Sequence, residues 1–328
     1  MRHDEKENFL RVIGWDEPSH VCYPVPSRGV CYHGAWPGDS RPSPNAKRWK
    51  DIWGVTWTDA DGEVFPTGPA IESIEHLDRL PRPDPHAPDR MRACRERLAA
   101  IDRDRYFVSV GHPYFLYENG FNVLGAEEFL VALAAHPEEA HALLDALLEF
   151  ELGVAEEYVE FEPDHVNTMD DYGMQDRLAV SPAMWREFFK PRLKRLYDFY
   201  RAELGDDIVI SHHSCGHVMP ILEDFIELGV AIINPVQSTA NDLARMRAVT
   251  SHRLVLAGGI DGQVVLPNGT PADVDAEVRS KLDLLWEDGG YLPMAEKMLG
   301  VGAENKAAME DAIAAWSAER VERHAAPV

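Results

Sequence analysis

The sequence predicts an α/β fold of the TIM or (β/α)8 barrel type, preceded by an irregular, proline-rich amino-terminal extension. From about residue 92 onward, segments with apolar residues three and four positions apart alternate with short β-branched runs. This alternation indicates a parallel sheet, because each crossover between parallel strands requires a helix that covers the sheet. About six strands are expected after residue 92 and one or two before it, which approaches the eight of a barrel.

A doubly wound sheet is the alternative fold for such an alternation. It favours a glycine-rich phosphate-binding turn after an early strand, and the sequence shows no such turn. The barrel is therefore the expected architecture.

The first 90 residues differ from the rest of the chain, because prolines are dense and aromatic residues cluster. The stretch WGVTWTDADGEVFPTG, residues 53–68, predicts a β-hairpin, since polar and apolar residues alternate up to an Asp-Gly turn. We expect residues 1–90 to form an extension that caps a barrel of residues 91–328, within a single structural domain.

The regular part of the chain contains the expected strands and the helices between them. The strands are expected at residues 105–111, 164–171, 207–213, 230–236, 253–261 and 289–295. The helices are expected at residues 91–101, 126–161 with a break at His136-Pro137, 181–204, 219–229, 242–250, 270–286 and 304–324. Two of these helices begin with an N-cap residue and a first-turn proline, at Ser181-Pro182 and Thr270-Pro271.

Composition limits the classes of function. The 328-residue chain is 45% hydrophobic and has a formal net charge of −24, which opposes binding to nucleic acid or to anionic membranes. No apolar run approaches the ~20 residues of a membrane helix, and the opening segment MRHDEKENFL is too charged for a secretory signal. The four cysteines are sparse and irregularly spaced, which argues against a disulfide framework. These features predict a reduced, cytoplasmic protein.

Polar residues stand at the end of every expected strand after residue 92. Active sites of TIM barrels lie at the carboxyl ends of the strands, so this coincidence predicts a functional site there. A single polar strand end would mean little, because loops are polar in any case. The residues concerned are His112; Asp170, Asp171, Tyr172 and Gln175; His212, His213 and Cys215; Asn234 and Gln237; Asp261; and Glu296 and Lys297.

The stretch SHHSCGHVMP, residues 211–220, contains three histidines and one of the four cysteines. The pair His213 and Cys215 offers two zinc ligands on one short loop, although catalytic zinc requires three protein ligands and an open position. A Cys-His nucleophilic pair and a buried, inert cysteine are the alternatives, and the pattern by itself leaves them open.

Several motifs in order resemble the uroporphyrinogen decarboxylase superfamily, over roughly residues 45 to 318. They are DDYGMQDRLAVSPAMWREFFKPRLKRLYDF, HHSCGHVMPILEDFIELGVAIINPVQ, LAGGIDGQVVLPNGTPADVDAEV and GGYLP. The resemblance is closest to the methyltransferase-like branch, which includes the corrinoid-protein:coenzyme M methyltransferases. It implies a TIM barrel with an amino-terminal extension, and zinc held by an H-x-C pair and a later cysteine. Carried onto this chain, the pair is His213 and Cys215, and the zinc would activate a thiol that accepts a methyl group from a corrinoid.

The chain departs from this family pattern in two places. No cysteine follows Cys215, so we expect Glu296 to be the third zinc ligand, with His217 and Asp261 as substitutes. The decarboxylase branch has an arginine-rich amino-terminal motif for the carboxylates of its substrate, whereas YPVPSRGVCYHG, residues 23–34, offers Arg28 alone. Classical uroporphyrinogen decarboxylation is therefore not expected.

The remaining strand-end residues receive expected roles. Because adjacent strand residues point in opposite directions, only one of Asp170 and Asp171 is expected to face the barrel mouth. Tyr114, Trp53 and Trp57 either roof the pocket or simply pack against the hairpin. We assign catalysis to Asp170, Asp171 and Asp261, metal binding to His213, Cys215 and Glu296, and substrate binding to Arg28, His112, Tyr114, Gln175, His212, Asn234 and Gln237.

Three functions follow as hypotheses. The first is a zinc-dependent enzyme that moves a methyl group between a corrinoid protein and a thiol, pterin or other small nucleophile. The second is a metal-free decarboxylase of a small or tetrapyrrole carboxylate, with Asp170 or Asp171 stabilising a protonated intermediate and Arg28 binding the carboxylate. The third is a non-catalytic barrel that binds a corrinoid or tetrapyrrole partner. A homodimer is a possible assembly in each case.

Overall fold

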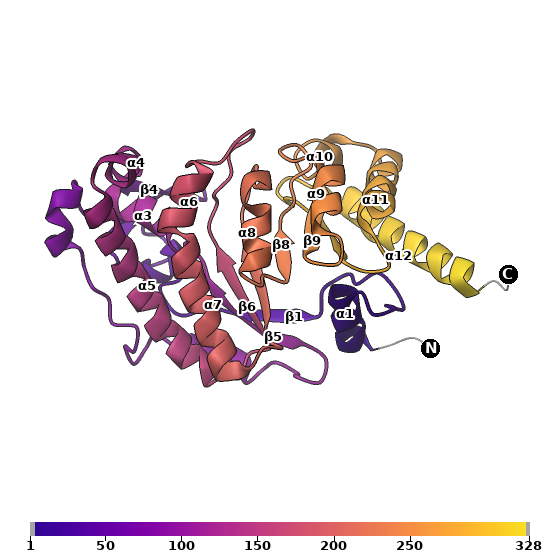
Figure 1. The fold of residues 1–328 in the computed structure, drawn as a ribbon, viewed down its shortest axis with the longest axis horizontal. Helices are drawn as coiled ribbons and strands as arrows, with labels where there is room; N and C mark the ends of the chain where they lie inside the picture. The colour runs from indigo at the N-terminus through magenta and orange to yellow at the C-terminus, as the bar shows by residue number, and fades with distance from the viewer. Residues whose placement is uncertain (1–3, 326–328) are drawn as a thin grey trace.

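The main part of the fold is a curved sheet of parallel strands with helices packed outside it (Figure 1). It is seen in a computed structural model that describes residues 4–325, with side chains up to residue 320. The sheet order is β1-β5-β6-β7-β8-β9-β10, and every neighbouring pair is parallel. The strands are β1 (Ser27–Val30), β5 (Phe107–His112), β6 (His165–Met169), β7 (Val209–His213), β8 (Ile232–Asn234), β9 (Val255–Ile260) and β10 (Tyr291–Ala295).

Most of the helices occupy the crossovers between these strands, as the alternating pattern predicted, whereas the first precedes β1 and the last follows β10. They are α1 (Glu5–Gly14), α2 (Arg92–Leu98), α3 (Tyr117–Leu124), α4 (Ala126–Ala135), α5 (Pro137–Val159), α6 (Pro182–Phe188), α7 (Lys190–Leu204), α8 (Leu222–Glu227), α9 (Leu243–Thr250), α10 (Val265–Asn268), α11 (Pro271–Leu285) and α12 (Ala303–Ala325). The break at His136-Pro137 separates α4 from α5. Ser181 and Thr270 cap α6 and α11, and Thr270 forms a capping box with Asp273.

The barrel-type α/β fold is confirmed, and all six strands expected after residue 92 are present, with β1 from the leader as a seventh. Within the described residues the sheet has seven strands rather than eight, and β1 and β10 are its edges. Helix α1 lies between these two edges. Its Val12 carbonyl accepts a hydrogen bond from the Gly290 amide before β10, and its Phe9 ring packs on Phe107 at the start of β5. Helix α1 therefore packs against the amino ends of both β10 and β5.

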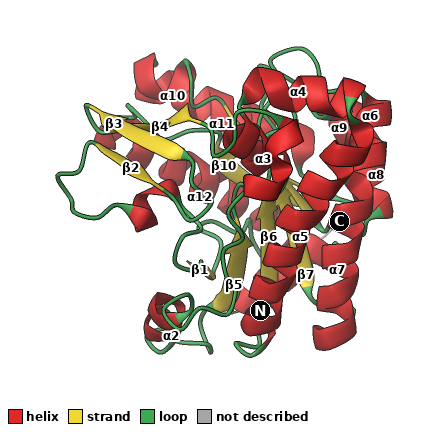
Figure 2. Cartoon of the chain, turned by 90° about the vertical axis from the view of Figure 1, so that its left-hand side faces the viewer, coloured by secondary structure: helices red, strands yellow, loops and turns green. Residues whose placement is uncertain are grey.

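The expected hairpin is present and carries a third strand. β2 (Arg48–Lys50), β3 (Thr56–Ala60) and β4 (Glu63–Gly68) form an antiparallel sheet. The β3–β4 turn has positive φ at Asp61 and Gly62, as a two-residue hairpin turn requires. This small sheet lies at the opposite end of the molecule from α2, which leads into the amino end of β5 (Figure 2).

The core between sheet and helices is mainly apolar, with a few buried polar side chains, such as His112 and Glu151. Leu143, Leu147 and Val154 of α5 face the sheet, and all six residues of β9 are buried. Among the described residues, no helix combines the length and the apolar character needed to cross a bilayer.

Candidate metal centre

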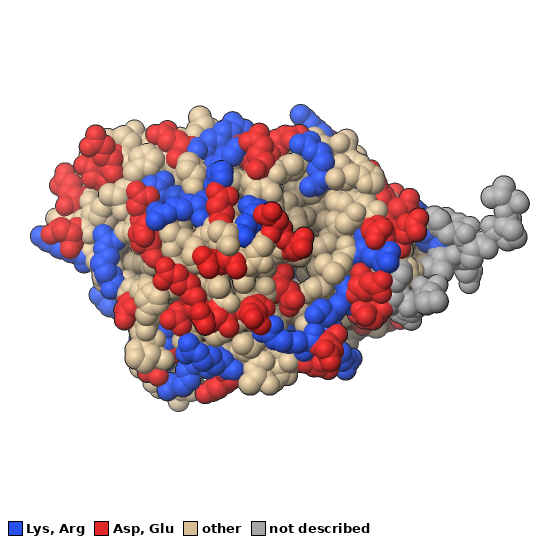
Figure 3. Space-filling model, turned by 60° about the horizontal axis from the view of Figure 1, so that its bottom comes forward, with Lys and Arg blue, Asp and Glu red and all other residues tan. Residues whose placement is uncertain are grey.

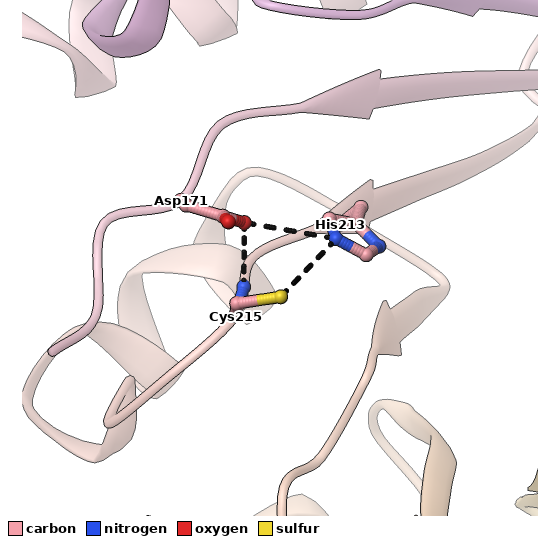
Figure 4. Close-up of side chains that lie close together, drawn as sticks. All are labelled: Asp171, His213 and Cys215. Carbon is pink, nitrogen blue, oxygen red and sulfur yellow. Dashed lines mark hydrogen bonds and ion pairs between the residues drawn. The ribbon is translucent and has the colours of Figure 1, made fainter. Parts of the chain in front are cut away.

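Two neighbouring strands bring an acid, an imidazole and a thiol together at the carboxyl end of the sheet. Asp171 follows β6, His213 is the last residue of β7, and Cys215 lies two positions further (Figure 4). β6 and β7 are paired with Met169 opposite His213, and the Asp170 amide donates to the His213 carbonyl. This register sets Asp171 beside the loop that carries Cys215.

The three side chains, which we call the triad, point toward one another. His213 Nε2 lies 3.5 Å from Cys215 Sγ and 3.6 Å from Asp171 Oδ1. One ligand atom from each of Asp171, His213 and Cys215 lies within 4.8 Å of the others, and this is the group of possible metal ligands that the described residues form. Zinc–nitrogen and zinc–sulfur bonds of about 2.1 and 2.3 Å separate the two donor atoms by about 3.5 Å across a tetrahedral ion. The spacing therefore fits zinc.

Glycine backbones hold the two loops that carry the triad against each other. The Gly173 amide donates to the Cys215 carbonyl, and the His217 amide donates to the Met174 carbonyl. Gly216 has a φ of +80°, and a Cβ on it would lie 2.3 Å from the Gly173 carbonyl group. Only glycine fits there, so this close approach fixes the position of Cys215 relative to Asp171.

The electrostatic environment of the triad is short of positive charge. Burial raises the pKa of the Cys215 thiol to about 12, and the charges that raise it further belong to Asp171, Glu118 and Glu296. Burial lowers the pKa of His213, which favours the neutral imidazole that a metal binds, while Asp171 and Asn234 oppose that shift. Among the described residues, no Arg or Lys forms a hydrogen bond or ion pair with the triad.

Glu118 is a residue of the site that sequence reasoning missed. It lies in the first turn of α3, and its carboxyl group accepts a hydrogen bond from the Asp171 amide. Burial, with the charges of Asp170 and Asp171, raises its pKa to about 9. The signal in the sequence is its position six residues after the end of β5, beyond the strand end itself.

Two buried oxygen atoms near the triad have no hydrogen-bond partner among the described residues. They are Asn234 Oδ1, at the end of β8, and Glu296 Oε2, which follows β10. Asn234 is paired with His213 across β7 and β8, and its side chain interacts with the imidazole and raises the pKa of His213, while the charge of Glu296 raises the pKa of Cys215.

Glu296 does not join the triad, contrary to its expected role as third metal ligand. Its Oε1 accepts from the Ser238 amide, and burial raises the pKa of the carboxyl group. Of the substitutes, His217 Nδ1 contacts the Ala240 carbonyl, and Asp261 caps the turn that follows β9 by accepting from the Gln263 and Val264 amides. The third candidate ligand beside His213 and Cys215 is the carboxylate of Asp171.

Asp170 has a structural role in place of the expected catalytic one. It is fully buried, and its carboxylate accepts hydrogen bonds from three consecutive amides, Leu116, Tyr117 and Glu118, and from the Tyr172 hydroxyl. Burial raises the pKa of Asp170 to about 6 against the effect of these hydrogen bonds. Asp170 therefore anchors the start of α3, and its carboxylate is enclosed by these four donors.

His112 and His212, which were expected to bind substrate, point away from the mouth into the layer between sheet and helices. His112 is fully buried and contacts Glu151 Oε2 at 2.6 Å and the Tyr200 hydroxyl at 2.7 Å. His212 is also fully buried; it contacts Thr168, and its ring stacks on Tyr172. The alternation of strand side chains explains this, because His213 and not His212 shares the inner face with the site.

Arg28 lies at the wrong end of the sheet for the substrate role expected of it. On β1 it is level with Val108, near the amino end of β5, and its guanidinium group stacks on Tyr106 at 3.8 Å. The remaining candidates lie at the carboxyl end. Gln237 Oε1 accepts from the Gly216 amide, Gln175 donates to the Thr239 carbonyl, and Tyr114 packs against Trp36 and Trp57.

Comparison with known families matches residues 54–295 to the uroporphyrinogen decarboxylase (URO-D) family. The chain belongs to the uroporphyrinogen decarboxylase family. This confirms the resemblance noted in its sequence motifs and agrees with the barrel-type fold.

Among solved structures, this URO-D family member is similar to a methyltransferase from Methanosarcina mazei, with a TM-score of 0.64 and 19% identity. The match covers 81% of this chain and 76% of the methyltransferase, and at this identity it shows a shared fold. A weaker likeness, with a TM-score of 0.33 and 13% identity, is to Xanthomonas albilineans dihydropteroate synthase with 4-aminobenzoic acid, over 50% of this chain and 58% of that one. No curated protein sequence matches the chain.

Proposed function

We propose that this URO-D family member is a zinc-dependent methyltransferase that moves a methyl group from a corrinoid protein to a small nucleophile, a thiol or a pterin. The convergence of Asp171, His213 and Cys215 at the carboxyl end of the sheet carries this proposal. The similarity in fold to a methyltransferase supports it.

In this proposal the triad residues hold the zinc, and the fourth position is left for the acceptor. A zinc ion there would supply the positive charge that the site lacks and would lower the pKa of a thiol acceptor. The acceptor's lone pair would form the new bond to the methyl carbon while the bond from that carbon to its donor breaks and leaves its electron pair on the donor, and a thiol acceptor would release its proton to solvent. The Asp171 carboxylate also accepts a hydrogen bond from the Cys215 amide, which holds these two ligands next to each other.

Decarboxylation of a polycarboxylate has less support. Such a substrate requires guanidinium groups at the mouth, and Arg28 is at the amino end of the strands. Asp170, the other residue assigned to that chemistry, is occupied by four hydrogen bonds.

Metal content tests the proposal. We expect about one zinc per chain in the wild-type protein, by mass spectrometry of the purified protein, because three ligands and one open position form a catalytic zinc site. Cys215→Ala and Asp171→Ala should each lose most of the zinc. Cys31→Ala is the matched control, since Cys31 is also half-buried after a strand but belongs to no ligand group among the described residues.

Turnover separates the enzyme from a non-catalytic barrel. With methylcobalamin as donor and a thiol as acceptor, Cys215→Ala should lower the rate by about 100-fold or more, since a zinc ion contributes several kcal/mol. Wild-type protein that contains no zinc and takes none up on dialysis would overturn the proposal. Zinc binding without turnover would support the proposed metal site and contradict the proposed methyl transfer.

A further inference from the structure

A small pocket lies at the carboxyl end of the sheet, where the small antiparallel sheet meets the segments that follow β1 and β5. Its volume is about 20 Å³, which is room for about one water molecule or for the end of a larger ligand. The lining residues that bear on its chemistry are Asp51, Trp53, Trp57, Tyr114, Asn119 and Asn122.

The pocket is next to the strands that carry the triad. Tyr114 belongs to the segment from β5 to α3, in which the Phe115 amide donates to the Met169 carbonyl at the end of β6. Asn119 follows the three consecutive amides that donate to Asp170. Pocket and triad therefore lie at the same end of neighbouring strands, although none of the triad residues lines the pocket.

Two buried asparagines in the pocket have no hydrogen-bond partner in the part of the chain that the structure describes. Asn119 and Asn122 are 6% and 9% exposed, and neither side chain forms a hydrogen bond there. They are three positions apart on α3, which places them on one face of the helix. Asn241 is buried to a similar extent, and its side chain makes three hydrogen bonds. Because buried amides are normally satisfied in this way, the two in the pocket are placed to bind what enters it.

Aromatic side chains form the walls of the pocket. Trp53 and Trp57 are 4% and 3% exposed, so packing holds both rings in place. The rings of Trp57 and Tyr114 lie 6.1 Å apart between centroids at an angle of 60°. Flat aromatic faces next to amide groups favour a flat polar group over a tetrahedral one.

The pocket offers no free charge to a ligand. Asp51 is the charged residue of its lining, and both carboxylate oxygens are used within the protein. Oδ1 accepts from the Trp53 and Val55 amides at 2.9 and 3.0 Å, and Oδ2 accepts from the Trp57 indole N–H at 2.7 Å. A charged group would lose its water here without gaining an opposite charge, so a neutral group is favoured.

We propose that this pocket binds an uncharged, planar amide group, with Asn119 and Asn122 as its hydrogen-bonding residues. An amide carries a carbonyl acceptor and an N–H donor in one plane, and these complement the two asparagine side chains. The site is separate from the triad and does not depend on zinc. Two carriers have this chemistry, namely the carboxamide arms of a corrinoid and the ring lactam of a pterin.

Four probes with the same phenyl ring test the chemistry of the bound group. Benzamide, acetophenone, benzoate and benzamidine carry an amide, a ketone without N–H, an anion and a cation. Each is titrated into full-length protein, and ligand NMR measures the dissociation constant. We expect benzamide to bind about fivefold more tightly than acetophenone, since it adds a hydrogen bond, and benzoate to bind most weakly. Benzamidine is compared only between variants, because a chain with a net charge of −24 attracts cations nonspecifically.

Variants of the two asparagines identify the residues responsible. Asn119→Leu and Asn122→Leu keep the size of the side chain and remove its hydrogen bonds, so each should weaken benzamide binding about fivefold. Asn45→Leu is the matched control, because Asn45 is exposed and lies outside the pocket, and it should stay within about twofold of wild type.

Asn122→Asp gives a result that a loss of structure would not produce. The new carboxylate should weaken the binding of benzamide and tighten that of benzamidine about fivefold, because it supplies the charge that the pocket lacks. A variant that merely disturbs the pocket would weaken both probes.

Dicyanocobinamide and 6-methylpterin distinguish the two carriers. The one that binds Asn122→Leu more weakly than wild type carries the amide that the pocket holds. Benzamide that binds no more tightly than acetophenone, or binds wild type and both leucine variants equally, overturns the inference and leaves the pocket to water. Benzamide binding that is lost in the leucine variants supports it even where neither larger ligand binds. Zinc content is measured separately, so a protein without zinc overturns the proposed function and not this inference.

Discussion

Asp170 and Asp171 are consecutive residues with opposite surroundings. The side chain of Asp170 points outward from the end of β6 into the helical layer, where it binds the first amides of α3. The side chain of Asp171 points to the mouth and contacts His213. The alternation of strand side chains predicts that one of the two faces the mouth, but not which one.

Replacing Asp170 or Asp171 with alanine should therefore lower the free energy of unfolding by different amounts. Asp170→Ala should lower the free energy of unfolding by about 2–4 kcal/mol, because it leaves three backbone donors and the Tyr172 hydroxyl without a partner. Asp171→Ala should change stability by less than about 1 kcal/mol, since its side chain is 40% exposed. Urea denaturation in the presence of a chelator measures both, so that metal binding does not contribute. Equal losses would contradict the assignment of Asp170 to structure and Asp171 to the site.

Among the secondary-structure elements, helix α1 connects the amino ends of β10 and β5. It begins at the N-cap Asp4, whose side chain accepts from the Glu7 amide, and it ends at Trp15 in the left-handed conformation. Its last turn binds the chain just before β10 through the Gly290 amide. The Trp15 indole lies over Gly290, where a Cβ would come within 2.3 Å of the ring. The packing of α1 against the chain before β10 thus depends on the glycine at position 290.

Gly290→Ala should weaken the packing of α1 against the chain before β10. Gly290 has a φ of +69° and no room for a methyl group, so we expect a loss of about 2 kcal/mol or more from strain and displacement of Trp15. Gly14→Ala is the control within the same element, because a Cβ at Gly14 would meet no atom within 4 Å and alanine favours a helix. Thermal denaturation followed by tryptophan fluorescence measures both variants. An unchanged midpoint for Gly290→Ala would show that α1 does not hold the edges together.

The whole molecule carries many more acids than bases. Asp and Glu number 56 and Lys and Arg 32, for a formal net charge of −24. On the face shown in Figure 3, acidic side chains are spread over the surface with basic ones among them. Repulsion among so many like charges destabilises the compact state.

Salt should therefore stabilise the protein. Raising ionic strength from about 10 mM to about 150 mM shortens the Debye length from ~30 to ~8 Å, which screens this repulsion, and we expect the midpoint of thermal unfolding to rise by about 2–5 °C. Sodium chloride and choline chloride should act equally at the same ionic strength, since screening does not depend on the cation. A midpoint that falls with added salt would show that favourable ion pairs dominate instead.

Local patterns account for most of the fold. The β-branched runs, the break at His136-Pro137 and the caps at Ser181 and Thr270 are effects of neighbouring residues, so the strands and helices were predictable. Seven strands in place of eight was not predictable, because the packing of α1 between β1 and β10 joins residues nearly the whole chain apart.

The pair His213 and Cys215 could be found from the sequence because two residues of separation on one loop keep it together in any fold. The third member of the triad could not be found from the sequence. Asp171 lies 44 residues from Cys215 and 42 from His213, and only the register of β6 against β7 brings it to the triad. Glu296 satisfied the chemistry of a ligand and stands at a strand end, but its strand is three places from β7 in the sheet. By itself, the sequence determined which segments form strands, at which end their polar residues gather and to which family the motifs point. The lateral order of the strands and the direction of each side chain were decided by tertiary structure, since both depend on pairing between distant segments.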